Sequence, residues 1–93
     1  MKNPWSQAAD CLRTLSHPHR LQMVDLLLEK ERKVGELAKA CKILSHVASE
    51  HLQLLKAKGL LSSQRKGKCV YYFVSEEALA SILKCVRNRF FKR

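Results

Sequence analysis

The sequence predicts a mainly α-helical domain with one small β-hairpin, and three observations support this class. Apolar residues recur at intervals of three or four before Gly59 and again after Ser75, the spacing of helices with one buried face. Between these two regions lies an alternating, β-branched and aromatic stretch interrupted by a glycine. The chain has 93 residues, 46% of them hydrophobic, which is enough for one small core.

Two helices are expected in the first third of the chain. The first is predicted from Pro4 to Leu15, and Pro18 suits the first turn of a second helix that ends near Glu29. The second helix is apolar nearly all round, so we expect it at the centre of the domain. The stripe of the first helix consists of Trp5, Ala8, Ala9, Leu12 and Leu15.

Two shorter helices are predicted after a polar connection over Lys30–Lys33. The first runs from Glu36 to about Cys41, and the second from Ser45, a plausible N-cap, to Ala57. Gly59 stands where a helix C-terminus favours a left-handed residue. Two such helices joined by a three- or four-residue link form a helix-turn-helix.

The predicted hairpin and a last helix complete the chain. Strands over Leu60–Arg65 and Lys68–Val74 flank the tight turn at Lys66-Gly67. Ser75 is a plausible N-cap for the last helix, with Glu76 and Glu77 in the first turn and Lys92 and Arg93 at its C-terminal end. The prediction is therefore a winged helix-turn-helix forming a single domain over residues 1–93. The apolar stripe of the last helix consists of Leu79, Ile82, Leu83, Val86 and Phe90.

The charge distribution indicates a polyanionic partner. Lys and Arg number 18 against 8 Asp and Glu, a formal net charge of +10, and no acid lies between Glu50 and Glu76. Basic segments without acids attract nucleic acid because each neutralised phosphate releases counterions. A membrane is not the expected partner, since no apolar run is long enough to span a bilayer and no separate basic amphipathic helix is evident.

A helix-turn-helix followed by a basic hairpin suggests how double-stranded DNA would be bound. The second helix of the pair can enter the major groove with its exposed N-terminal residues at base edges. The Glu50 carboxylate would either accept a hydrogen bond from cytosine or be turned away from the DNA. The hairpin tip would reach the flanking minor groove or backbone. The candidates are Ser45, His46, Ser49, Glu50 and Gln53 for bases, Lys56 and Lys58 for phosphates, and Arg65, Lys66 and Lys68 at the tip.

Neither an enzyme nor an exported protein is expected. The chain has no nucleophile triad, phosphate-cradling glycine loop or H-E-x-x-H motif, and only three glycines. Its four cysteines lie far apart without a C-x-x-C, and the N-terminus lacks the apolar core of a secretory signal. We therefore expect a cytoplasmic protein with free thiols.

The ordered motifs resemble the ArsR/SmtB family of winged-helix repressors. The resemblance covers almost the whole chain and implies a homodimer built on the first and last helices, operator binding without inducer, and release by a metal, metalloid or redox signal. The apolar stripes of the two end helices, which a small domain could hardly bury alone, agree with such a dimer. The motifs are Leu15-Ser16-His17-Pro18-His19-Arg20-Leu21, Val34-Gly35-Glu36-Leu37-Ala38, Ser49-Glu50-His51-Leu52, Leu55-Lys56-Ala57-Lys58-Gly59-Leu60 and Gly67-Lys68-Cys69-Val70-Tyr71-Tyr72.

The ligand sites that the resemblance implies do not carry over to this chain. The stretch Glu36-Leu37-Ala38-Lys39-Ala40 has no cysteine where soft-metal sensors have a Glu-Leu-Cys box, and the last helix has no His or Asp for the family's zinc site. Sulfur-sensing members pair a cysteine of the second helix with one of the last, and the second-helix position is Asp25 here. No cofactor or metal site is therefore assigned.

Two alternatives remain for the sensed signal. Cys11 and Cys85, on the two end helices, could form a thiol sensor that binds a soft metal or metalloid or forms a disulfide, or they could be inert apolar fillers. The protein would accordingly be a repressor released by such a signal, or a winged-helix nucleic-acid-binding protein with no inducer site. Capping or surface roles are expected for His17 and His19, and packing or backbone contact for His51.

Overall fold

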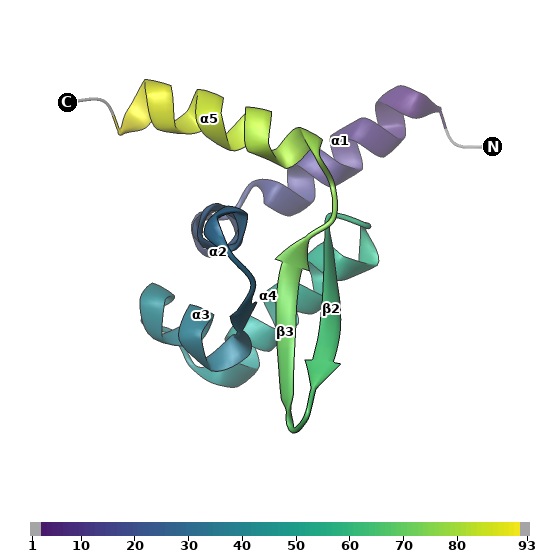
Figure 1. The fold of residues 1–93 in the computed structure, drawn as a ribbon. Coiled ribbons are helices and arrows are strands. Elements are labelled where there is room, and N and C mark those ends of the chain that lie inside the picture. Colours follow the sequence, from purple (N-terminus) through teal and green to yellow (C-terminus); the bar gives the residue numbers. More distant parts are fainter. Residues whose placement is uncertain (1–2, 92–93) are drawn as a thin grey trace.

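Helix α2 (Pro18–Glu29) lies in the middle of the fold, with the other elements arranged around it (Figure 1). The structure is a computed structural model that describes residues 3–91. Pro18 occupies the first turn of α2 as predicted, and His17 is its N-cap, with Nδ1 accepting a hydrogen bond from the His19 backbone N–H at 3.1 Å. Met23 and Val24 are completely buried, which confirms the expected central position.

Helices α1 (Pro4–Leu15) and α5 (Ala78–Phe90) lie along the side of the molecule opposite the hairpin tip (Figure 1). The prediction for α1 is confirmed, but Ser75 is not the N-cap of α5. The Ser75 hydroxyl donates to the Gly59 carbonyl at 3.3 Å, and α5 begins three residues later. The Glu76 carboxylate accepts from the Ala78 N–H at 3.1 Å, so the two glutamates precede the first turn. Lys92 and Arg93, expected at the end of this helix, lie outside the described residues.

Helices α3 (Val34–Cys41) and α4 (Ser45–Ala57) form the predicted helix-turn-helix with a three-residue link. Helix α3 begins two residues earlier than expected. Ser45 is the first residue of α4 rather than its N-cap, which is Leu44 and provides no side-chain hydrogen bond. In the link, Lys42 has a left-handed backbone with φ 58°. Gly59 is also left-handed, with φ 77°, as expected after α4.

A three-stranded antiparallel sheet in the order β1-β3-β2 contains the hairpin. Strands β2 (Leu61–Lys66) and β3 (Cys69–Val74) pair from Leu61 with Val74 to Lys66 with Cys69, and Gly67 turns between them with φ 65°. Strand β1 (Arg32–Lys33) pairs with Tyr72 and Tyr71 of β3, although the sequence indicated only a polar connection there. This short strand fixes the base of the wing to the segment between α2 and α3.

The core contains side chains from every helix and from the hairpin. Its largest fully buried members, with Met23 and Val24, are Leu37, Leu52, Leu55, Leu61 and Leu79. Within residues 3–91, no buried side-chain nitrogen or oxygen lacks a hydrogen-bond partner. The five helices and small sheet of this region confirm the predicted winged helix-turn-helix.

Much of the apolar surface on the end helices is not covered in the protomer. Trp5 is 82% exposed, Leu12 54% and Phe90 71%, whereas Leu15, Leu79 and Leu83 are buried. The predicted stripes of α1 and α5 are therefore divided, with part of each turned inward and part left in contact with water. Large apolar residues left exposed on α1 and on α5 make these helices candidates for an interaction surface.

Truncation of the core side of α4 is expected to destabilise the protein. Leu52→Ala removes a completely buried side chain and should lower the free energy of unfolding by about 2–5 kcal/mol. Leu54→Ala, the same substitution on the same helix at a residue that is 46% exposed, is the matched control and should cost less than about 1 kcal/mol. Urea unfolding at one protein concentration measures both, and equal losses would contradict this description of the core.

Candidate nucleic-acid interface

Helix α4 carries a polar stripe along one flank of its core-facing side. Ala48, Leu52 and Leu55 are fully buried on the inner face. Ser49 and Gln53 neighbour each other on the outside, with Gln53 Nε2 donating to Ser49 Oγ at 3.4 Å. Because residues three or four positions apart share a helix face, the stripe runs along Ser45, Ser49, Gln53 and Lys56, with His46 and Glu50 beside it.

Two lysines at the C-terminal end of α4 have different surroundings. Lys56 Nζ donates to Ser63 Oγ of β2 at 2.7 Å, so the polar stripe continues onto the hairpin. Lys58 Nζ instead bonds the Asp10 carboxylate of α1. The ammonium of Lys58 therefore links α4 to an end helix and differs in placement from the other predicted phosphate ligands.

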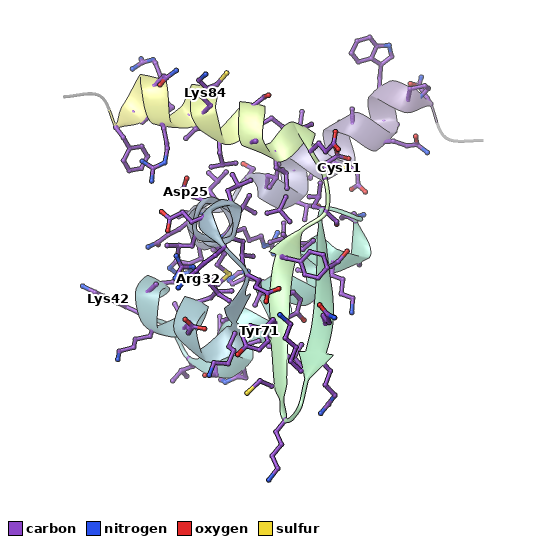
Figure 2. All side chains as sticks on the ribbon, in the orientation of Figure 1. Cys11, Asp25, Arg32, Lys42, Tyr71 and Lys84 are labelled. Atoms are coloured by element: carbon purple, nitrogen blue, oxygen red, sulfur yellow. The ribbon has the colours of Figure 1, made fainter. Side chains whose placement is uncertain are left out.

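The wing has an anchored side and a free tip. Lys66 bonds the Glu31 carboxylate, and its ammonium lies 5.2 Å from the centre of the ring of Tyr71, which Figure 2 shows on the hairpin. Tyr72 is buried and Tyr71 half-buried, which confirms that adjacent tyrosines face opposite sides of the strand. Arg65 and Lys68 are exposed and form no ion pair within residues 3–91. Their charges are thus available to a ligand at the tip.

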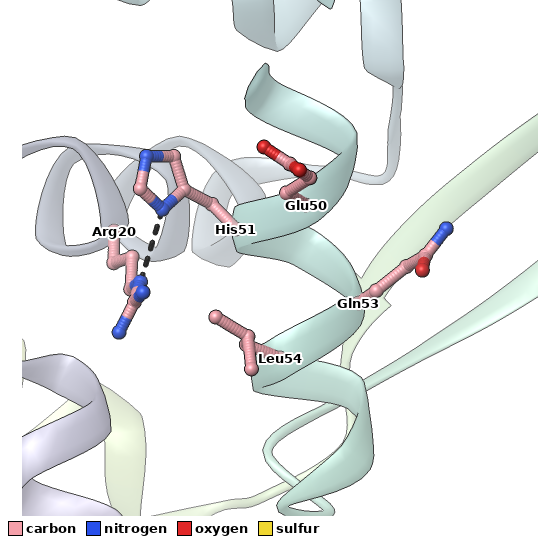
Figure 3. A pocket seen from close by; sticks show the side chains of 5 residues that line it. All are labelled: Arg20, Glu50, His51, Gln53 and Leu54. Carbon is pink, nitrogen blue, oxygen red and sulfur yellow. Dashed lines mark hydrogen bonds between the residues drawn. The ribbon is translucent and has the colours of Figure 1, made fainter. Parts of the chain in front are cut away.

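A shallow pocket lies on another side of α4, lined by Arg20, Glu50, His51, Gln53 and Leu54 (Figure 3). Arg20 Nε donates to His51 Nδ1 at 3.0 Å, and its Nη1 donates to the Thr14 carbonyl at the same distance. Arg20 therefore joins α1, α2 and α4. Glu50 lines this pocket together with Gln53, so its carboxylate lies beside one of the predicted base-contacting side chains.

Three histidines meet where the start of α2 contacts α4. The ring centres of His17 and His51 are 4.5 Å apart, and His19 lies 5.3 Å from His17 and 5.9 Å from His51. The expected capping role of His17 is confirmed, but sequence reasoning missed the cluster. The only available signal was the pair His17-Pro18-His19 at one helix start, because His51 is more than thirty residues away.

Burial and neighbouring charge alter the protonation of His51. Burial is the largest cause that lowers its pKa, followed by the nearby His17, Arg20 and His19, while Glu50 acts in the opposite direction. A lowered pKa keeps this imidazole neutral near pH 7. In that state Nδ1 can accept the hydrogen bond from Arg20.

The cysteines are all free thiols in the protomer. Cys11 is half-buried on α1 (Figure 2). Cys85 is exposed on α5, so both cysteines lie on helices that carry exposed apolar residues. Cys69 is half-buried beside the turn. Cys41 is buried in the core, and burial raises the pKa of its thiol. Cys41 therefore packs as a small apolar residue of the core.

Asp25 forms a two-point ion pair with Arg87 that connects α2 and α5. Arg87 Nε donates to Asp25 Oδ1 at 2.8 Å and Nη2 donates to Oδ2 at 2.6 Å. Such paired, parallel hydrogen bonds fix relative orientation as well as distance. The position that the resemblance associates with a sulfur-sensing cysteine is thus part of an ion pair between the core helix and an end helix.

These elements define a winged helix-turn-helix protein with a basic wing and a polar recognition helix. Residues 17–63 match the family described as bacterial regulatory protein, arsR family, and the chain belongs to this family. The resemblance found in the sequence is therefore confirmed, as is the prediction that the protein is a regulator rather than an enzyme. No helix among residues 3–91 is long and apolar enough to cross a membrane.

Individual relatives extend the match over nearly the whole chain. The biofilm growth-associated repressor of Xylella fastidiosa is 32% identical over 90 residues, 97% of this chain and 79% of the relative. Nodulation protein NolR of Rhizobium meliloti is 36% identical over 76 residues, 82% of this chain but 62% of that relative's length. A homodimeric winged helix-turn-helix DNA-binding domain from Mycobacterium bovis has a TM-score of 0.81 at 34% identity, covering 90% of this chain and 78% of that one.

Acidification is expected to destabilise the protein through His51. The unfolded chain takes up a proton on this residue near its ordinary pKa of about 6.5, whereas the lowered pKa delays protonation in the folded state. The unfolded state then binds more protons, so the free energy of unfolding falls as the pH falls through this window. Urea unfolding at about pH 7.5 and about pH 5.5 measures the decrease.

Two histidine variants on α4 isolate this contribution. His51→Gln should show a smaller decrease between the two pH values than the unaltered protein. His46→Gln, at an exposed residue near the start of the same helix, should keep the full decrease. An undiminished decrease in His51→Gln would contradict the assignment.

Proposed function

We propose that this protein is a homodimeric repressor that binds operator DNA through α4 and the wing. The observation that carries the proposal is the continuity of the exposed polar stripe on α4 with the basic hairpin, through the contact between Lys56 and Ser63. A groove-bound helix flanked by a charged hairpin provides both base contacts and phosphate contacts. Membership in a family of regulatory proteins supports the same function.

The side chains divide by chemistry into two roles. Hydroxyl, imidazole and amide groups can exchange hydrogen bonds with base edges, and we assign sequence choice to Ser45, His46, Ser49 and Gln53. Arg65 and Lys68 at the wing tip, with Lys56, supply charge for phosphates. Lys66 would act partly through its support of the wing, because its ammonium is held by Glu31. Lys58 is paired with Asp10 in the protomer, and the Glu50 carboxylate would be repelled by phosphates unless it accepts from cytosine, so neither is assigned a main role in this proposal.

Dimerisation is proposed through α1 and α5. Trp5, Leu12 and Phe90 leave a large apolar area in contact with water, and burial of such area stabilises association. The related Mycobacterium bovis domain is described as homodimeric, which supports the same arrangement here. Two copies would present two recognition helices to a two-fold symmetric operator.

A thiol-reactive, metal or metalloid signal that releases the repressor is part of this proposal. Cys11 and Cys85 are its candidate thiols, because both lie on the helices of the proposed dimer interface. The alternative is a winged-helix nucleic-acid-binding protein without an inducer site. DNA affinity measured with and without oxidants or metals separates the two, because the alternative requires that affinity be unchanged.

Removal of the free wing charges is expected to weaken DNA binding at all sequences. The double variant Arg65→Ala, Lys68→Ala should bind a duplex from the protein's own promoter more weakly, and the plot of log affinity against log salt should become shallower by about 0.9 per lost phosphate contact. Titrations by fluorescence anisotropy at several salt concentrations measure both quantities.

The control for this experiment is Lys84→Ala, which removes a positive charge from α5, at the end of the molecule opposite the wing tip (Figure 2). Its salt dependence should match that of the unaltered protein. If the wing variant and the control lose affinity equally, net charge rather than the wing is responsible, and the proposed interface is wrong.

Truncation of the exposed anchors on the end helices is expected to yield monomers. The double variant Trp5→Ala, Phe90→Ala removes two large aromatic side chains from the proposed interface, where such residues dominate association. Size-exclusion chromatography with light scattering measures the mass. Leu44→Ala alters another exposed apolar residue, 67% exposed and beside α4, and should remain dimeric. A dimer of undiminished stability in the double variant would contradict the assignment.

A further inference from the structure

We propose that His17, His19 and His51 form a binding site for a divalent first-row transition-metal ion such as Zn²⁺, between the start of α2 and the recognition helix. One ring nitrogen from each histidine can be chosen so that all three lie within 4.8 Å of one another. All three side chains are half-buried, so the site is shielded but reachable from solvent. The inference goes beyond the cysteine sites considered above.

The geometry of the cluster is close to that of a three-histidine site. Zn–N bonds of about 2.0–2.1 Å at tetrahedral angles place ligand nitrogens about 3.3 Å apart. The three imidazoles therefore need to approach by no more than about 1.5 Å, which side-chain rotation can supply. Two ligands come from one helix start and the third from α4, so the ion would join these elements directly.

The donor set selects the class of ion. Imidazole nitrogen favours Zn²⁺, Co²⁺, Ni²⁺ and Cu²⁺ over the hard cations Mg²⁺ and Ca²⁺. The buried Cys41 approaches the backbone carbonyl of His19, with Sγ 4.0 Å from the oxygen, but its sulfur is not among the ligand atoms that gather at this site. A nitrogen-only coordination is therefore expected, with the remaining positions open to water.

The ion can bind only if hydrogen bonds already made by the histidines are broken. A neutral imidazole has a single in-plane lone pair, and that of His51 already accepts from Arg20. Whichever ring nitrogen binds the ion, the Arg20–His51 hydrogen bond must break, either because Nδ1 is the ligand or because Nδ1 then carries the proton. His17 Nδ1 likewise accepts a hydrogen bond from the His19 N–H, so this capping bond must also break when His17 binds the ion.

Metal binding would thus exchange one connection of the recognition helix for another. Arg20, which also holds the Thr14 carbonyl of α1, would release α4, and the ion would attach α4 to the first turn of α2. Both the position of α4 and the local charge would change. An effect on DNA affinity rests on the proposed function, whereas binding of the ion itself does not.

The test is metal binding by the full chain in the absence of DNA. Zn²⁺ affinity is measured by competition with a chromogenic chelator, and Co²⁺ coordination by visible and near-ultraviolet absorption. We expect one ion per protomer and no sulfur-to-cobalt charge-transfer band.

His51→Gln and His19→Gln should each weaken affinity for Zn²⁺ at least about tenfold. His46→Gln, which alters the histidine outside the cluster, should leave this affinity unchanged. His19 is included because its imidazole makes no hydrogen bond within residues 3–91, so its variant is the less disruptive to the fold.

Arg20→Gln provides a test in which the affinity for Zn²⁺ should rise rather than fall. It removes the donor that occupies the His51 lone pair and a positive charge beside the ion, while its amide oxygen can accept from a ligand N–H, as second-shell groups do. Affinity for Zn²⁺ should therefore rise. Weaker binding in Arg20→Gln, unaltered affinity in both cluster variants, a strong sulfur-to-cobalt band, or no binding at millimolar metal would each overturn the proposal. Failure of DNA binding alone would count against the proposed function and not against this site.

Discussion

Burial of α2 is the constraint on which the other elements depend. In a domain of this size few side chains can be removed fully from water, and Met23 and Val24 at the middle of α2 are among them. The remaining helices and strand β3 pack around this helix, so its two ends lie near different functional surfaces. One end contacts α4 through Arg20, and Asp25 in its second half contacts α5 through Arg87. The recognition helix and the proposed dimer surface are therefore positioned by the same rigid element.

Most of the fold could be predicted because its strongest signals are local and periodic. Pro18 and the repeated apolar residues define α1 and α2, and Gly67 defines the hairpin turn. The errors concern weaker preferences that tertiary contacts override. Ser75 has a good capping side chain, but its hydroxyl is used by the Gly59 carbonyl across the domain. Strand β1 spans two residues, which is too short for any alternation to be detected.

The candidate sites were predictable to different degrees. The polar stripe of α4 follows from the inward spacing of Ala48, Leu52 and Leu55, since the residues outside this buried face must lie nearer to solvent. The partners of Lys58 and Lys66 could not be predicted, because Asp10 and Glu31 approach them only after the chain has folded. The histidine cluster is a product of the contact between α2 and α4, and sequence spacing alone indicates two of its three members.

The anchoring of the wing has a consequence for the entropy that is lost when a partner binds. Strand β1 pairs with the middle of the hairpin, and the bond from Lys66 to Glu31, with the ammonium over Tyr71, holds the hairpin nearer its turn. The conformational entropy of this segment is therefore lost when the protein folds, and little remains to be lost when a partner arrives. The wing meets its partner as a preorganised surface, with mobility confined to the long side chains of Arg65 and Lys68 at its tip.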